Sequence, residues 1–219
     1  MDLKDFFPSI SAKQIKKLFT SSFFNYNEQI ATALALLTTY EAKLPTGAPT
    51  SPVLSNFVCH NMDAELYFFC SFNGLQFTRY ADDLTFSSDI FISKDVIQNI
   101  IQIIKNNGFE INEKKLRLQS FYRRQTVTGL TVNEKVNVSR HLLKKIRAMI
   151  HDLNSNGIDA ATQRHFGKDV ARNAQYNYRK HFIYRLEGYL NFVGQVRGKE
   201  DAVYNKLKAS FLDFFANAR

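Results

Sequence analysis

Two adjacent aspartates, Asp82 and Asp83, interrupt a stretch of strand-forming residues, and this feature limits the folds that the chain can adopt. Residues 75–88 read LQFTRYADDLTFSS, in which aromatic and β-branched residues flank the acidic pair. This pattern predicts a β-hairpin with Ala81, Asp82 and Asp83 at its tip. Neighbouring carboxylates repel each other, so the tip either stays in water or binds a divalent cation that relieves the repulsion.

Helical patterns surround the predicted hairpin. Ser11 and Gln14 have the spacing of a capping box, and Ser93 precedes an amphipathic segment that Gly108 ends. The segment KLPTGAPTSP at 43–52 contains turn residues throughout and predicts a structured loop. We expect a short helix after Ser11, helices at about 27–40, 51–70 and 93–107, a strand at 109–111, a second hairpin at about 120–138, and helices at about 139–153, 159–172, 178–196 and 199–217. The order predicts an α+β domain followed by an all-α module, with the boundary near Val138.

Positive charge is concentrated in the second half of the chain. Residues 1–118 carry 11 Lys and Arg against 12 Asp and Glu, whereas residues 119–219 carry 18 against 8. A module with this balance suits a polyanion such as nucleic acid, although a solubilising face has the same composition.

Other features exclude several classes of protein. No apolar run is long enough for a transmembrane helix, and the first residues have no signal-peptide pattern, so we expect a cytoplasmic protein with no membrane partner. Cys59 and Cys70 lie in apolar surroundings and are interpreted as packing residues. The five histidines show no zinc-ligand spacing.

Five segments in chain order resemble the motifs of bacterial reverse transcriptases of the retron type. They are DLKDFFPSI at 2–10, LPTGAPTSP at 44–52, FTRYADDLTFS at 77–87, GFEIN at 108–112 with Lys115 and Arg117 after it, and VTGL at 127–130. The resemblance implies a polymerase palm over residues 1–138, with an antiparallel sheet and packed helices. A basic, α-helical thumb would follow over residues 139–219, and the fingers would be largely missing.

The resemblance also implies roles for individual residues. Asp2 and Asp82 would hold two Mg²⁺ ions, with help from Asp83 and the Leu3 carbonyl. Phe6 and Phe7 are expected in an extended segment, in which one faces the core and the other the site. Phe7 would select deoxyribonucleotides, unless it is a core residue. Lys115 would approach the triphosphate, unless it is a solvated lysine. Further contacts are expected from Thr46 and Gly47 to the template and nucleotide, from Val127, Thr128 and Gly129 to the primer, and from Arg140, Lys144, Lys145 and Arg147 to duplex phosphates.

The implied activity is RNA-directed DNA synthesis on a structured RNA, in antiphage defence. The expected partners are an RNA template, an RNA/DNA duplex, dNTPs, an upstream fingers fragment and a retron effector protein. Because the fingers motifs are missing, we expect little or no polymerase activity from this chain alone. The alternatives are a group II intron-like or other bacterial reverse transcriptase, and an inactive fragment that only binds RNA.

Overall fold

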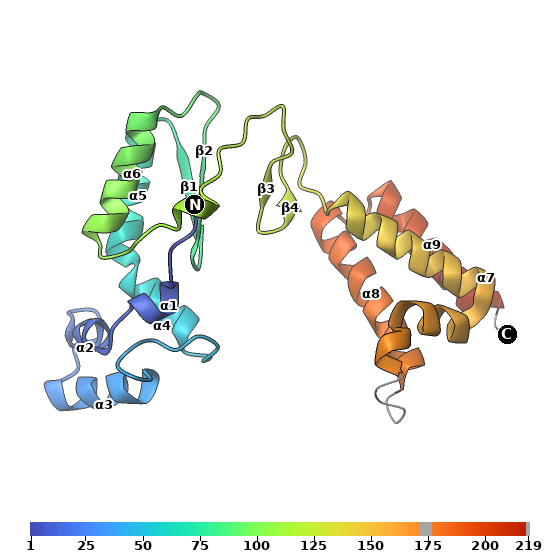
Figure 1. Ribbon diagram of the computed structural model, residues 1–219, viewed down its shortest axis with the longest axis horizontal. Coiled ribbons are helices and arrows are strands. Elements are labelled where there is room, and N and C mark those ends of the chain that lie inside the picture. Colours follow the sequence, from blue (N-terminus) through green and yellow to red (C-terminus); the bar gives the residue numbers. More distant parts are fainter. Residues whose placement is uncertain (171–176, 218–219) are drawn as a thin grey trace. The chain divides into compact units, whose positions relative to one another are not determined.

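The computed structural model describes the backbone of residues 1–170 and 177–217, which form two compact units, Met1–Leu118 and Gln119–Arg219 (Figure 1). Each unit has its own hydrophobic core. The boundary between the two units, at Leu118 and Gln119, lies earlier in the chain than the predicted boundary near Val138. Compact packing and functional modules can divide a chain differently, so the palm and thumb limits stay a prediction.

The N-terminal unit places short helices around a small antiparallel sheet. Its elements are α1 (Phe6–Ser9), α2 (Ala12–Thr20), α3 (Glu28–Thr38), α4 (Ser51–Val58), α5 (His60–Phe72), β1 (Gln76–Tyr80), β2 (Asp83–Ser87), α6 (Lys94–Asn106) and the 3₁₀ turn η1 (Glu113–Lys115). The predicted caps are confirmed: Ser11 and Gln14 form a capping box on α2, and the Ser93 side chain accepts a hydrogen bond from the Val96 amide. These caps fix where the helices begin.

Strands β1 and β2 form the predicted hairpin, paired from Gln76–Ser87 to Tyr80–Asp83. The segment Met1–Lys4 extends this sheet. Leu3 N donates to Asp82 O at 2.9 Å on one side, and Lys4 N donates to Glu110 O at 2.8 Å on the other. Leu3, Leu84 and Ile111 are buried together in the core beneath the sheet. The start of the chain therefore lies between the hairpin and the segment that follows α6.

Two local predictions were wrong. Phe6 and Phe7 were expected in an extended segment, but they begin the helix α1. Four residues are too few to show a helical period, and Pro8 is tolerated in the first turn of a helix. The strand expected at 109–111 contributes only an isolated bridge between Ile111 and Leu3.

The C-terminal unit is a short hairpin followed by three helices. Its elements are β3 (Thr126–Val127), β4 (Leu130–Thr131), α7 (Arg140–Val170), α8 (Tyr178–Arg197) and α9 (Ala202–Asn217). Gly157 interrupts α7 with φ 76° and ψ 170°, so α7 consists of the two helices that the sequence predicts on either side. Residues 171 and 172 of the predicted second helix lie outside the described residues. The core of the unit is made by α7, α8 and α9.

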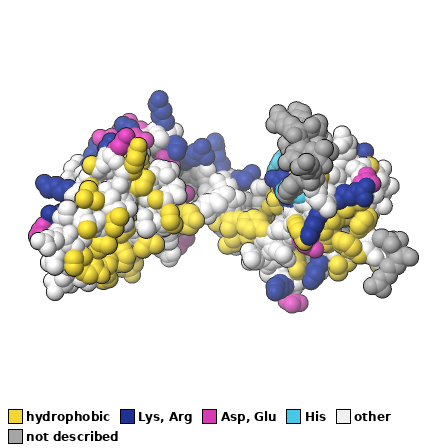
Figure 2. Space-filling model, turned by 90° about the horizontal axis from the view of Figure 1, so that it is seen from below, with side chains coloured by type: hydrophobic (Ala, Val, Ile, Leu, Met, Phe, Trp, Pro, Cys, Tyr) yellow, Lys and Arg dark blue, Asp and Glu magenta, His cyan; other side chains and the backbone are white. Residues whose placement is uncertain are grey.

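Both cysteines are buried and unpaired, as the sequence predicts. Burial raises the pKa of the Cys59 thiol to about 12, which keeps it a neutral packing group. No described helix is long and apolar enough to cross a membrane. Hydrophobic side chains nevertheless gather on one face of the N-terminal unit (Figure 2). Leu37, Phe72 and Phe91 are each more than 80% exposed.

Candidate active site

Two segments of the N-terminal unit bring acidic residues together. Asp2 lies opposite Asp83 in an antiparallel bridge, and Asp82 precedes Asp83 in the hairpin turn. The flanking bonds, Leu3 N to Asp82 O and Leu84 N to Met1 O, make Asp2 and Asp83 a non-hydrogen-bonded pair. Side chains of such a pair project from the same face and lie close together. Two carboxylates from distant parts of the sequence thus share one small surface.

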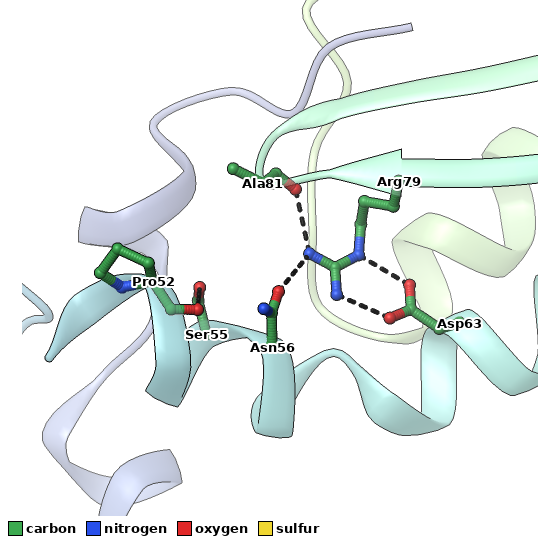
Figure 3. A network of polar contacts seen from close by, with 6 residues as sticks. All are labelled: Pro52, Ser55, Asn56, Asp63, Arg79 and Ala81. Atoms are coloured by element: carbon green, nitrogen blue, oxygen red, sulfur yellow. Dashed lines mark hydrogen bonds and ion pairs between the residues drawn. The ribbon is translucent and has the colours of Figure 1, made fainter. Parts of the chain in front are cut away.

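The turn between the strands has an unusual backbone. Ala81 has φ 53°, in the left-handed region that costs a residue with a Cβ roughly 1–2 kcal/mol. A hydrogen bond from Arg79 Nη1 to the Ala81 carbonyl, at 3.1 Å, holds this turn (Figure 3). The Arg79 side chain is only 7% exposed. The sequence assigned no role to Arg79, although an arginine whose side chain points inward from a strand must have a partner.

Lys115 supplies a positive charge beside Asp2. Its Nζ lies 3.0 Å from both carboxylate oxygens of Asp2. The lysine side chain is 57% exposed and that of Asp2 is 22% exposed, so water screens the pair only in part. The structure therefore brings Lys115 to the acidic surface, where it contacts a carboxylate. Its approach to the triphosphate stays a prediction.

The donor set suits magnesium in its chemistry. Among the described residues, no three His, Cys, Asp or Glu side chains converge closely enough to enclose a metal ion. Magnesium, however, usually takes only one or two protein carboxylates and completes its octahedron with phosphate and water. The opposed Asp2 and Asp83, with Asp82 adjacent, meet that requirement. The Leu3 N–H faces the turn, where it donates to the Asp82 carbonyl, and the role of the Leu3 carbonyl stays a prediction.

The other candidate residues of this unit are arranged less closely. Phe7 is half-buried, packs on the core and has its ring 5.2 Å from that of Phe6. Thr46 and Gly47 are exposed in a loop, where Gly47 has φ 90°. The Ser51 hydroxyl closes that loop by donating to the Pro45 carbonyl at 2.6 Å. The roles of Phe7, Thr46 and Gly47 stay predictions.

A separate open cavity of about 460 Å³ lies at the C-terminal end of α6. Its lining includes Lys105, Phe109 and Glu110, and none of the three aspartates. The three aspartates, each partly exposed, therefore lie outside this cavity.

The remaining candidate residues belong to the C-terminal unit. Thr128 and Gly129 form a two-residue turn with φ 47° and 84°, as a type I′ hairpin requires, and Val127 pairs with Leu130. Arg140, Lys144, Lys145 and Arg147 are all exposed on the first turns of α7. Lys145 donates to the Tyr189 hydroxyl at 3.0 Å, and this bond lowers the pKa of Tyr189. In the part of the chain that the structure describes, no ion pair engages Arg140, Lys144 or Arg147.

Comparison with known proteins defines the class to which this fold and site belong. Residues 1–137 match the family "Reverse transcriptase (RNA-dependent DNA polymerase)". The match covers more than half of the chain and includes Asp2, Asp82 and Asp83. The chain belongs to the reverse transcriptase family.

The similar proteins narrow the class. The chain is 38% identical over 157 residues to the retron Ec86 reverse transcriptase of Escherichia coli, across 70% of this chain and 48% of that protein. It is 35% identical over 170 residues to the retron Mx65 reverse transcriptase of Myxococcus xanthus, across 69% of this chain and 39% of that protein. The chain thus spans less than half the length of these curated relatives. Their names support the retron-type interpretation of the sequence motifs.

Proposed function

We propose that this chain is the catalytic part of a retron-type RNA-directed DNA polymerase. The observation that carries the proposal is the opposed pair of Asp2 and Asp83, with Asp82 beside it, inside the segment that matches the family. Residues 1–138 act as the palm and residues 139–219 as the thumb. The substrates are an RNA template, its RNA/DNA duplex product and dNTPs.

Asp2, Asp82, Asp83 and the Leu3 carbonyl hold two magnesium ions in this proposal. When bound, the ions supply activation of the primer hydroxyl and neutralisation of the triphosphate charge. The protein contributes mainly position and charge, because phosphoryl transfer needs little acid–base chemistry from side chains. Lys115 exchanges its contact with Asp2 for one with the triphosphate, keeping its charge paired in both states.

The contacts along the nucleic acid follow from charge and exposure. Arg140, Lys144 and Arg147 present cations to the duplex backbone, which gives affinity without sequence recognition. Lys145 joins them when it leaves Tyr189. The hairpin turn at Val127, Thr128 and Gly129 contacts the primer. Phe7 restricts the sugar, and Thr46 and Gly47 contact the template and nucleotide.

A wider biological role is part of the same proposal. The relatives bear the names of retron enzymes. We propose that this chain acts in antiphage defence, in the cytoplasm and together with an effector protein. The chain spans less than half the length of those relatives. We also propose a fingers fragment as a partner of this chain.

Primer extension tests the proposal. The assay uses an RNA template, Mg²⁺ and dNTPs, with the chain alone and with the chain plus an added fingers segment. We expect extension only with the added segment. The Asp82→Ala, Asp83→Ala double variant should reduce it by about 1,000-fold or more, since a metal clamp is worth several kcal/mol. RNA binding without extension in either arrangement would leave a binding-only protein.

A further inference from the structure

We infer that Arg79 is a positioning residue for the acidic turn, acting through the Ala81 carbonyl rather than on the substrate. The inference rests on the proposed function, because it treats Asp82 and Asp83 as metal ligands. Arg79 lies on β1 and connects three elements: its own hairpin, α4 and α5 (Figure 3). Its side chain is almost wholly buried, so this connection is part of the folded unit.

The guanidinium group is fixed before it reaches the turn. Its Nε and Nη2 donate to the two carboxylate oxygens of Asp63 on α5, at 2.7 and 2.6 Å. Its Nη1 donates to Asn56 Oδ1 on α4 at 3.1 Å. A bidentate pair of this kind fixes the plane of the guanidinium as well as its position. The helices therefore determine where the last donor of Arg79 points.

That donor determines the geometry of the peptide that leads into Asp82. Arg79 Nη1 donates to the carbonyl of Ala81, the residue held at positive φ. The carbonyl of Asp82 accepts from Leu3 N at 2.9 Å. Asp82 thus lies between two fixed peptide groups, one held by Arg79 and the other by the segment that carries Asp2. If the first were released, Ala81 could relax out of its strained conformation and turn Asp82 and Asp83 away from Asp2.

A lysine at this position would keep the charge and lose the fork. One ammonium group cannot hold both oxygens of Asp63 and also reach Ala81 with defined geometry. Partners that orient metal ligands in this way typically contribute about 10–100-fold to metal affinity. Arg79→Lys therefore separates positioning from charge.

The test uses the full 219-residue chain and Mn²⁺ as the probe, so that it does not depend on polymerase activity. Mn²⁺ binding is measured by titration calorimetry or electron paramagnetic resonance, and amide exchange of Leu3 by NMR. We expect Arg79→Lys to weaken Mn²⁺ binding by about 10-fold or more and to speed exchange at Leu3, with the far-UV circular dichroism unchanged. Asn56→Ala removes one acceptor and keeps the fork, so it should act in the same direction but less, and it serves if Arg79→Lys fails to fold.

Arg197→Lys is the matched control. Arg197 forms the same kind of bidentate pair, with Asp201, in the C-terminal unit. Its substitution should leave Mn²⁺ affinity and Leu3 exchange as they are in the wild type. Wild-type Mn²⁺ affinity or unchanged Leu3 exchange in Arg79→Lys would overturn the inference. If the wild type binds no Mn²⁺, or if Asp82→Asn, Asp83→Asn binds it equally well, the metal assignment of the proposed function fails. Exchange at Leu3 then decides alone whether Arg79 positions the turn.

Discussion

Arg79 in the N-terminal unit and Arg197 in the C-terminal unit form the same bidentate pair with an aspartate, but they hold different things. The Nη1 group of Arg79 holds the strained turn that precedes Asp82, while the other donors of the guanidinium bond Asp63 on α5. Arg197 instead donates to Asn137, while its partner Asp201 caps α9 by accepting from the Val203 and Tyr204 amides. One network fixes a functional backbone conformation, and the other fixes how helices begin and pack.

The two units also differ in their balance of charge. The N-terminal unit has nearly equal numbers of cationic and anionic residues, whereas the C-terminal unit has more than twice as many cationic as anionic ones. Precise placement of a few carboxylates needs a rigid local frame, and it does not need a net charge on the unit. Binding to a phosphate backbone needs the opposite, since many exposed cations add up without fixed geometry. The comparison predicts that the two units fail in different assays when they are altered.

The largest expected effect is on duplex binding. Replacing Arg140, Lys144 and Arg147 by Gln removes three exposed cations from α7. The slope of log affinity against log salt should fall by roughly 2–3, which is about 100-fold or more in affinity at 0.1 M salt. Fluorescence anisotropy with an RNA/DNA duplex, repeated over a range of salt concentrations, measures both quantities.

The matched control neutralises three exposed lysines of the N-terminal unit, Lys13, Lys17 and Lys94. We expect a much smaller change in the salt slope. An equal loss in the control would mean that net charge alone attracts the duplex, and the assignment of binding to the C-terminal unit would be lost.

The hydrogen bonds of the buried Asp152 offer a test of whether the C-terminal unit unfolds independently of the N-terminal unit. Asp152 is 6% exposed and accepts hydrogen bonds from Arg164, from Asn156 at 3.1 Å and from His165 Nε2 at 3.0 Å when that nitrogen is protonated. Asp152→Ala should reduce the free energy of unfolding of this unit by about 2 kcal/mol, because it removes three hydrogen bonds to a buried carboxylate, whereas Arg164 is 61% exposed and can be solvated. Hydrogen exchange read by mass spectrometry would localise the loss.

Asp159 provides the comparison for that variant. It pairs with Arg179, but both side chains are more than 60% exposed. Asp159→Ala should therefore change the unfolding free energy by less than about 1 kcal/mol. Faster exchange in the N-terminal unit after Asp152→Ala would show that the two units do not unfold separately.

How far the sequence predicts this molecule depends on how local each signal is. The hairpin, its Asp82–Asp83 tip and the caps at Ser11 and Ser93 were predictable, because each depends on neighbouring residues. The opposition of Asp2 and Asp83 joins distant segments. No periodicity reveals it, and only the resemblance to reverse transcriptases pointed to it.

The partners of Arg79 and Lys115 were beyond the sequence for a different reason. Asp63 has the pattern of an ordinary polar residue on a helix, and nothing in its neighbourhood marks it as the partner of a buried arginine. Lys115 was expected near the triphosphate. Its bond to Asp2 depends on the pairing of two backbone segments that are far apart in the sequence. Ion pairs between elements follow from packing, which single residues do not encode.

Acid should expose a further difference between the units. The hydrogen bond from Arg197 lowers the pKa of Asp201 to about 2, against about 3.9 in an unfolded chain. A depressed pKa gives stability that is present above the unfolded value and is lost as pH falls toward the folded value. Asp201→Asn should therefore lower the stability of the C-terminal unit at neutral pH and flatten its loss between about pH 4 and pH 2.

Circular dichroism during acid titration, with exchange to assign the unit, measures this change. Asp213→Asn, on the exposed side of α9, is the control and should leave the acid profile unchanged. An acid profile of Asp201→Asn that matches the wild type would mean that Asp201 contributes no pH-dependent stability.

The smallest effect concerns the strain in the acidic turn. Ala81→Gly removes a left-handed cost of roughly 1–2 kcal/mol, but it also frees the unfolded chain, which costs about 0.4–1 kcal/mol. The net gain in unfolding free energy should be about 0.5 kcal/mol. In an Arg79→Lys background the gain should be smaller, because Ala81 can then relax out of the strained conformation and leaves less strain for glycine to remove. A double-mutant cycle by urea denaturation measures this coupling. Equal gains in both backgrounds would mean that Arg79 and the Ala81 conformation are independent, and that the strain in the turn is supported by the sheet alone.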